Sequence, residues 1–248
     1  MPEASRNIIP AKGSSVNEAG EDLSVVIPAA GVGRRMKSHG PKSLIHIKDC
    51  SLIERQIRLV QKYYPKSEII VVAGFRSDLL REKIRRRYPV RIVYNFQHED
   101  TNVCRSIGIG LQACNRKSVL LIYGDLVFNY KTIKGLHDGI SKMVFDSKGS
   151  FKEEEVGIMI SKEQIVTNLS FGLKNKWCQI TYLHGRELKM LEEISIKDEH
   201  ERWFGYEAIN KVIEEGGRFV GVEPSGMKIF EIDSPKDLQR LYLNIKLI

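Results

Sequence analysis

The 248-residue sequence contains no apolar run that approaches the ~20 residues needed to cross a bilayer, which argues against an integral membrane protein. Residues 1–22 also lack an apolar stretch followed by a cleavage site, so we expect no secretory leader in them. The four cysteines lie far apart and form no C-x-x-C pair, which argues against a zinc site and against a disulfide framework. We therefore expect reduced thiols in a cytoplasmic protein.

Other patterns are missing too. None of the six histidines falls in a metal-ligand or triad pattern, and the sequence shows no internal repeat. The net charge is +8, from 39 basic and 31 acidic residues, which suits an anionic partner such as nucleic acid, a membrane surface or a phosphorylated metabolite. The densest basic run, at residues 81–87, lies in a segment of helical spacing and is typical of a solvated helix face. The net charge alone does not show which of these partners the protein binds.

From residue 23 onward, short apolar runs alternate with segments of helical spacing. Strands are predicted at Leu23–Pro28, Glu68–Ala73, Val90–Tyr94 and Ser118–Tyr123, and helices at Ser51–Tyr63, Asp78–Arg87 and Thr101–Cys114. This alternation predicts right-handed βαβ units. The fold class is therefore α/β, a Rossmann-like and mostly parallel sheet with helices on both faces.

After residue 145 this rhythm changes, because strands follow one another without intervening helices. They are expected at Val156–Ile160, Gln164–Leu169 and Trp177–Leu183, and predict a small antiparallel excursion. We expect residues 145–205 to include a lid or an acceptor-binding subregion. Helices at Glu187–Glu193 and Tyr206–Glu215, strands at Phe219–Val222 and Lys228–Ile232, and a helix beginning at Ser234 complete one domain. That domain covers residues 23–248, and residues 1–22 form a loose N-terminal extension.

A loop of small residues directly follows the first strand. Its small members are Ala29, Ala30, Gly31 and Gly33, and they let backbone N–H groups approach a base and a triphosphate closely. The dinucleotide fingerprint G-x-G-x-x-G is not met, because Met36 stands where its third glycine belongs. The basic side chains that follow are Arg34, Arg35 and Lys42, which can neutralise charge in a phosphoryl transfer. We expect these three to be catalytic.

Two motifs together resemble a known family. The stretch P-A-A-G-x-G-x-R-M (Pro28 to Met36), followed by P-K-x-L (Pro41 to Leu44), resembles the signature of sugar-nucleotide and related nucleotidyltransferases, the MobA-like NTP transferase domains among them. The resemblance implies a nucleotide-binding α/β fold and metal-assisted transfer of a nucleotidyl group onto a phosphate. It extends from about residue 23 to the C-terminus, is strongest at both ends, and is thin between residues 140 and 200.

Within that family the chain is most similar to the phosphocholine cytidylyltransferase type. Asn95, Asn102 and Ser106 resemble its base-recognition stretch, and Glu231–Leu238 resembles its C-terminal acidic motif. The resemblance implies CTP as the nucleotide and a small phosphorylated acceptor as the partner. We expect neither a membrane nor nucleic acid as a partner, and a homodimer stays open.

Two aspartates are candidate ligands of Mg²⁺, which proteins usually bind through one or two carboxylates plus substrate phosphates. Asp125 follows an apolar strand, at the edge where open α/β sheets bind ligands. Asp233 closes a later strand just before a capped helix. Each is also of a type found in turns and caps, but both match the metal-binding acids of the resembled family. Glu231 alternates with Asp233 along the strand and is a weaker third candidate.

The acceptor site is the least defined part of the prediction. Trp203, Tyr206 and Glu207 form a cluster of aromatic faces and a carboxylate that suits a cationic head group. The competing interpretation is that the aromatic residues pack the end of a helix into the core. A phosphorylated choline-like alcohol, a polyol phosphate, a phosphonate and a sugar phosphate all stay open as acceptors.

Three alternative functions agree less well with the sequence. An isoprenoid-pathway cytidylyltransferase typically carries Asp-Ala-Ala-Arg-Pro where this chain has residues 123–127, Tyr-Gly-Asp-Leu-Val. A sugar-1-phosphate uridylyl- or thymidylyltransferase usually carries Q-x-E-x-x-G-T-A where this chain has residues 95–102. A non-catalytic nucleotide- or RNA-binding relative would have no need of Lys42, Asp125 and Asp233. Each alternative therefore ranks below cytidylyl transfer.

Overall fold

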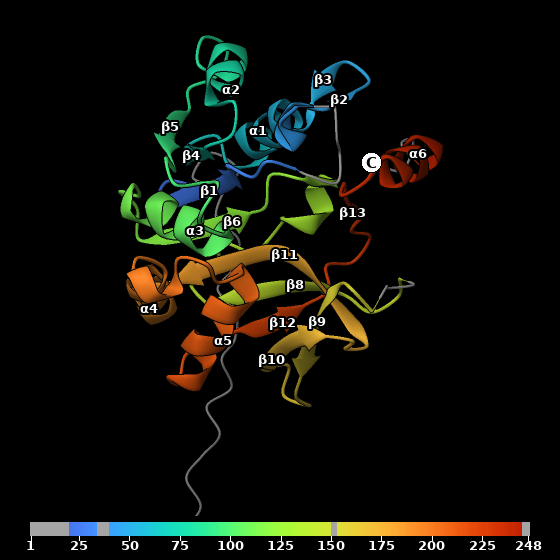
Figure 1. Cartoon of the computed structure of the whole chain (residues 1–248). Helices are drawn as coiled ribbons and strands as arrows, with labels where there is room; N and C mark the ends of the chain where they lie inside the picture. The colour runs from blue at the N-terminus through green and yellow to red at the C-terminus, as the bar shows by residue number, and fades with distance from the viewer. Residues whose placement is uncertain (1–19, 34–39, 150–152, 245–248) are drawn as a thin grey trace, which may run out of the picture.

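The structure is a computed structural model that describes residues 20–33, 40–149 and 153–244 (Figure 1). Most of the N-terminal extension expected at residues 1–22 lies outside these ranges. Arg34 and Arg35, two of the three residues predicted to be catalytic, also lie outside the described residues.

The centre of the fold is a parallel sheet. Its four strands, in spatial order, are β6 (Ser118–Ile122), β1 (Leu23–Ala29), β4 (Glu68–Ala73) and β5 (Arg91–Tyr94). Every residue of β1 from Leu23 to Pro28 is buried. Such a continuous apolar run is what a strand covered on both faces requires.

An antiparallel half extends this sheet beyond β6. Its long strand is β11 (Asn175–His184), which pairs antiparallel with β6 and also with β8 (Lys142–Asp146) and β9 (Val156–Ile160). At the far edge β10 (Val166–Phe171) pairs with β9, and β12 (Val220–Val222) pairs parallel with β8. The antiparallel excursion is therefore confirmed, and β8 adds a strand that the sequence did not indicate.

Helices cover both faces of the sheet (Figure 1). The core on one face includes apolar side chains of α1 (Leu52–Tyr63) and α2 (Ser77–Ile84). The core on the other face includes those of α3 (Val103–Gln112), α4 (Gly185–Ser195) and α5 (Gly205–Glu214). Side chains of β1 alternate between the two cores, with Val25 and Ile27 in the first and Val26 in the second. The predicted α/β fold with a parallel centre is confirmed.

Two short strand pairs and the last helix lie outside the main sheet. The short strands β7 (Leu126–Phe128) and β13 (Ile229–Glu231) pair antiparallel, and β2 (His46–Ile47) pairs with β3 (Cys50–Ser51). The last helix, α6 (Pro235–Asn244), packs on a third apolar cluster that includes Ile47, Val127 and Leu241. Three 3-10 turns, Lys42–Leu44, Tyr130–Thr132 and Asp198–His200, complete the described elements. The β7–β13 pair thus fixes a late segment of the chain against the loop that follows β6.

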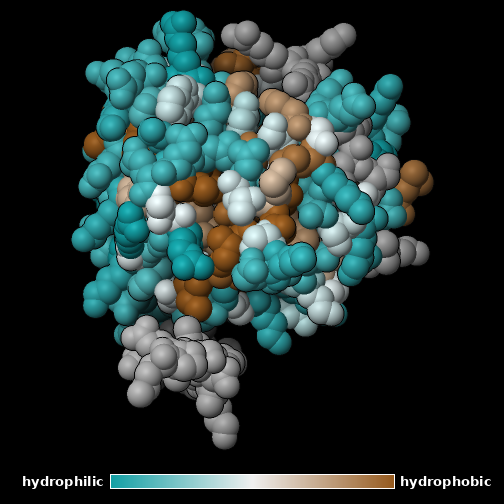
Figure 2. Space-filling view, turned by 90° about the horizontal axis from the view of Figure 1, so that it is seen from below, coloured by the Kyte–Doolittle hydropathy of each residue, from teal (hydrophilic) through white to brown (hydrophobic). Residues whose placement is uncertain are grey.

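The lower end of the molecule, as drawn in Figure 1, carries β9, β10 and α5. Seen from below, apolar residues gather near the middle of this face and hydrophilic residues surround them (Figure 2). Met159, Phe171 and Phe204, at this end, are each about half exposed. Among the described residues, no helix combines the length and the apolarity needed to cross a membrane.

Candidate active site

A cleft of about 450 Å³ opens at the carboxyl ends of β1 and β6, where open α/β sheets bind their ligands. Its lining includes most of the residues that the sequence singles out: Ala29, Ala30, Gly31, Gly33, Lys42, Asn95, Asn102, Ser106, Asp125, Tyr206, Glu231 and Asp233. The fold therefore brings together residues from the beginning, the middle and the end of the chain.

The small-residue loop forms one side of this cleft. The carbonyl of Ala30 accepts a hydrogen bond from the Phe75 backbone N–H at 3.0 Å, which fixes the chain as it leaves the sheet. Gly33 has a φ of +62°, in the left-handed region that favours glycine. A Cβ atom at Gly33 would lie only 2.8 Å from Cγ of Lys42. Glycine is therefore required here both by the backbone and by the approach of Lys42.

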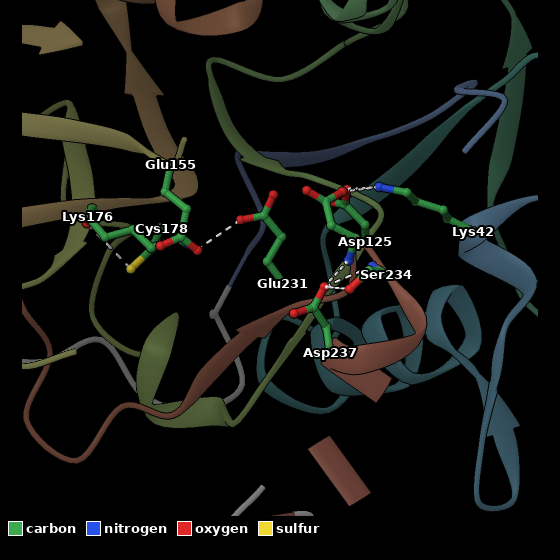
Figure 3. Close-up of polar contacts among 9 residues, drawn as sticks. Lys42, Asp125, Glu155, Lys176, Cys178, Glu231, Ser234 and Asp237 are labelled. Carbon is green, nitrogen blue, oxygen red and sulfur yellow. Dashed lines mark hydrogen bonds and ion pairs between the residues drawn. The ribbon is translucent and has the colours of Figure 1, made fainter. Parts of the chain in front are cut away.

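Lys42 contacts both predicted metal ligands, Asp125 and Asp233, and Figure 3 shows its side chain reaching Asp125. Its Nζ lies 3.4 Å from Oδ2 of Asp125 and also forms an ion pair with Oδ1 of Asp233. Burial disfavours the ammonium form, but the charges and hydrogen bonds of Asp125 and Asp233 outweigh it and raise the pKa of Lys42. Burial, aided by the carboxylates of Glu231 and Asp233, raises the pKa of Asp125 to about 6 against the opposing charge of Lys42. The site is thus a compact, half-buried charge cluster.

Three carboxylates of this cluster suit a hard cation. Asp125, Glu231 and Asp233 each offer one oxygen, and the three oxygens lie within 4.8 Å of one another. Oδ1 of Asp125 is buried and has no hydrogen-bond partner in the described part of the chain. Oxygen ligands of this kind are those that Mg²⁺ prefers, so these residues fit the metal that the family resemblance implies.

Glu231 carries a second ion pair on its other side. Oε2 of Glu231 lies 3.0 Å from Nζ of Lys176, which also meets Oε1 of Glu155 at 2.5 Å (Figure 3). Burial opposes the charge of Lys176, but Glu231 and Glu155 outweigh it and raise the pKa of Lys176 to about 12. Sequence reasoning missed Lys176, because its partners lie far from it along the chain.

Asp233 is held by the start of α6. Oδ2 of Asp237 accepts hydrogen bonds from the backbone N–H groups of Asp233 (3.2 Å) and Ser234 (2.8 Å), and from the Ser234 hydroxyl (2.7 Å). These contacts fix the turn that leads into the helix. The predicted helix start is confirmed, with Pro235 as the first helical residue.

The three predicted base-recognition residues, Asn95, Asn102 and Ser106, also make hydrogen bonds within the protein. Asn95 is buried, and its amide donates to the hydroxyls of Thr101 and Ser106, both at 3.1 Å, and accepts from Gln97 N at 3.0 Å. This amide therefore organises the loop. The side-chain oxygen of Asn102 caps α3 by accepting from Val103 N at 3.0 Å. Asn95, Asn102 and Ser106 all line the cleft.

Four aromatic side chains also line the cleft: Tyr123, Trp177, Phe204 and Tyr206. Tyr206 and Phe204 stack with ring centroids 6.0 Å apart, and Trp177 meets Tyr123 edge-on at 5.6 Å. Of the three residues predicted to bind the acceptor, Tyr206 therefore takes part in this wall.

The other two predicted acceptor residues lie elsewhere. Trp203 stacks on His200 with ring centroids 3.7 Å apart and packs against the core, as the competing interpretation expected. The carboxylate of Glu207 accepts from the Phe204 backbone N–H at 2.7 Å and so caps α5. Trp203 and Glu207 are thus in structural positions, and neither is among the residues that line the cleft.

Two further residues that line the cleft, Gln179 and His98, were not predicted from the sequence. Gln179 has a φ of +56°, unusual for a residue with a side chain, where the register of β11 is interrupted between Trp177 and Thr181. His98 also lines the cleft, and its ring centroid lies 6.4 Å from that of Phe75. No local pattern marks either residue.

The geometry is that of an α/β protein with a lysine–carboxylate site in a cleft at the carboxyl ends of its parallel strands. A family model of the MobA-like NTP transferase domain matches residues 25–152, and the chain belongs to this family of nucleotidyltransferases. The bifunctional protein GlmU of Francisella tularensis is 33% identical over 104 residues, which cover 42% of this chain. That match spans only 22% of the relative's length.

Solved structures share the fold. The CTP:phosphocholine cytidylyltransferase of Streptococcus pneumoniae superposes with a TM-score of 0.71 at 20% identity, covering 90% of this chain and 99% of that one. The inositol-1-phosphate CTP transferase of T. maritima gives a TM-score of 0.74 at 16% identity, covering 92% and 97%. At these identities the likeness establishes the architecture.

Proposed function

We propose that this chain transfers CMP from CTP to a small phosphorylated acceptor and releases pyrophosphate. One observation carries the proposal: Lys42 and the carboxylates of Asp125, Glu231 and Asp233 meet in a cleft whose other side is the small-residue loop. Carboxylates and an ammonium beside an open backbone loop are the groups that nucleotidyl transfer requires.

The reaction needs no nucleophile from the protein. An oxygen of the acceptor phosphate attacks the α-phosphorus of CTP, the bond from that phosphorus to the α–β bridging oxygen breaks, and pyrophosphate leaves. The acceptor phosphate is already anionic at neutral pH, so no general base is required. Mg²⁺ bound by Asp125 and Asp233 would neutralise the phosphate oxygens and orient the acceptor against the α-phosphate.

The chain supplies charge and alignment. Lys42, together with Arg34 and Arg35 on the same loop of the sequence, neutralises the triphosphate and the leaving pyrophosphate. Backbone N–H groups of the small-residue loop approach the phosphates. Because this chemistry is mostly positioning, small displacements of these groups are expected to slow it strongly.

Cytosine as the base and the acceptor class rest on different observations. Asn102 and Ser106 offer polar groups to a pyrimidine edge, and two solved structures with this fold are named as CTP-dependent enzymes. Their named acceptors, phosphocholine and inositol-1-phosphate, are both small phosphorylated alcohols. The aromatic wall of Trp177, Phe204 and Tyr206 suits a head group of that size, with a cation as one option.

A product screen tests the proposal. The protein is incubated with Mg²⁺, each of CTP, UTP, dTTP and ATP, and a panel comprising phosphocholine, polyol phosphates, phosphonates and sugar 1-phosphates. Mass spectrometry and pyrophosphate release are the readouts. We expect a CMP-containing product. A UMP- or dTMP-sugar product would favour the sugar-1-phosphate alternative, and nucleotide binding without pyrophosphate release would favour a non-catalytic relative.

A further inference from the structure

Gln56 is a buried amide on α1 that touches the loop carrying Asp125. Its side chain is only 2% exposed, and Nε2 donates to the carbonyl of Tyr123 at 2.9 Å and to the carbonyl of Leu126 at 2.8 Å. These two carbonyls lie on either side of Asp125 in the sequence. One amide therefore spans the turn that presents the carboxylate.

We propose that Gln56 is a positioning residue for the metal-binding carboxylate of Asp125. The inference rests on the metal role proposed above for Asp125. Within the described ranges, Gln56 is the only residue outside this turn whose side chain hydrogen-bonds the backbone of residues 123–126. Backbone groups also anchor the turn: Tyr123 N donates to Gln179 O at 3.4 Å, Gly124 N to Pro28 O at 3.1 Å, and Ile232 N to Asp125 O at 3.0 Å.

The chemistry of the contact explains why this position carries glutamine. Two carbonyl oxygens face one group, so that group must donate twice and accept nothing from them. An amide nitrogen does this, whereas a carboxylate offers no donor at neutral pH and an apolar side chain would leave two buried carbonyls without these bonds. A polar side chain that is buried without hydrogen bonds would destabilise the folded protein.

The helix that carries Gln56 is a rigid support. Ile53, Ile57 and Val60 of α1 are fully buried in the core. At its start, the Glu54 carboxylate accepts from the Ser51 backbone N–H (3.0 Å) and hydroxyl (2.8 Å). The amide therefore transmits the position of a well-anchored helix to the turn. The oxygen of Asp125 must stay within reach of those of Glu231 and Asp233 for all three to share one cation.

The test compares two amides that bridge backbone groups, the buried Gln56 and the partly buried Asn210. Gln56→Met keeps the length of the side chain and removes both donors. Its matched control is Asn210→Leu, because Asn210 accepts from Leu169 N (2.9 Å) and donates to Leu169 O (2.7 Å), joining α5 to β10. Binding of Mn²⁺ to the full-length protein is measured by electron paramagnetic resonance, with Asp125→Asn as the reference. Thermal unfolding and CTP binding in EDTA are measured alongside.

We expect both variants to unfold at a lower temperature, while only Gln56→Met binds Mn²⁺ more weakly, by roughly tenfold. CTP binding in EDTA should be unchanged. Wild-type Mn²⁺ affinity in Gln56→Met, together with lost binding in Asp125→Asn, would overturn the inference. Wild-type affinity in Asp125→Asn would instead remove the proposed metal site itself. If Gln56→Met does not fold, Gln56→Asn retains an amide with a shorter reach, and its Mn²⁺ affinity decides in the same way.

Discussion

Replacing Lys42 by methionine should make the stability of this protein depend strongly on Mg²⁺. The change keeps most of the side-chain length and removes the cation that lies between Asp125 and Asp233. At an effective dielectric constant near 20, Coulomb's law gives an attraction of about 5 kcal/mol across the 3.4 Å from Lys42 to Asp125. Desolvation of the pair offsets part of this attraction.

The loss of unfolding free energy in Lys42→Met depends on how far solvent screens the ion pair of Lys42 and Asp125. The side chains of Lys42 and Asp125 are 18% and 21% exposed, so solvent screens the pair only in part. We expect the metal-free variant to lose about 2–3 kcal/mol of unfolding free energy. For a chain of this size that corresponds to a fall in Tm of roughly 5–10 °C. The loss arises because three carboxylates then face one another without the ammonium.

Mg²⁺ should restore much of this loss. A divalent cation held by Asp125, Glu231 and Asp233 would supply the positive charge that the variant lacks, so its binding to the folded state should raise Tm more in Lys42→Met than in the wild type. Differential scanning calorimetry in EDTA and in saturating Mg²⁺ measures both values. Lys142→Met is the matched control, because Lys142 is 12% exposed and pairs with Asp138 rather than with the cluster. A gain in Tm from Mg²⁺ that is equal to or smaller than the wild-type gain would refute the reasoning.

The remaining predictions concern turnover, the loop and the acceptor. Asp125→Asn should retain its circular dichroism spectrum and lose about a hundredfold or more of its pyrophosphate release, and activity within a few-fold of wild type would exclude a metal role. Gly33→Ala should lose about 1–2 kcal/mol in urea unfolding and slow turnover, because its φ is positive and Lys42 lies close. Gly31→Ala is its control, since a Cβ there meets nothing within 4 Å, and equal losses in the two would contradict the strain argument. Tyr206→Leu should raise the KM of the acceptor and leave the KM of CTP unchanged, whereas an unaltered acceptor KM would remove the aromatic wall from the site.

Most of the central sheet could be predicted because its strands carry continuous apolar runs. The predicted bounds of β4 and β9 agree with the structure, and β1 differs by one residue. The strand β8 could not be predicted, since only three apolar residues lie between Lys142 and Asp146. Its pairing with β11 and β12, both later in the chain, makes it a strand.

The candidate site shows the same division. Asp125 and the small-residue loop are marked by position, because each lies just after a buried strand. The amide of Gln56 has no such mark, since a polar residue in an amphipathic helix is usually solvated. The capping role of Glu207 could not be read from the sequence for a related reason: a carboxylate in the first turn of a helix caps it as readily as it binds a cation.

The pairing of β7 with β13 has a consequence for the order of events during synthesis. Asp125 leaves the ribosome with the parallel sheet, while Glu231 and Asp233 follow only after the antiparallel half and α5. A nascent chain that ends before β13 can therefore fold much of its sheet and still hold an incomplete set of carboxylates. The proposed cation site is therefore completed only after the parallel sheet that carries Asp125, so cation binding would follow the folding of that sheet rather than assist it.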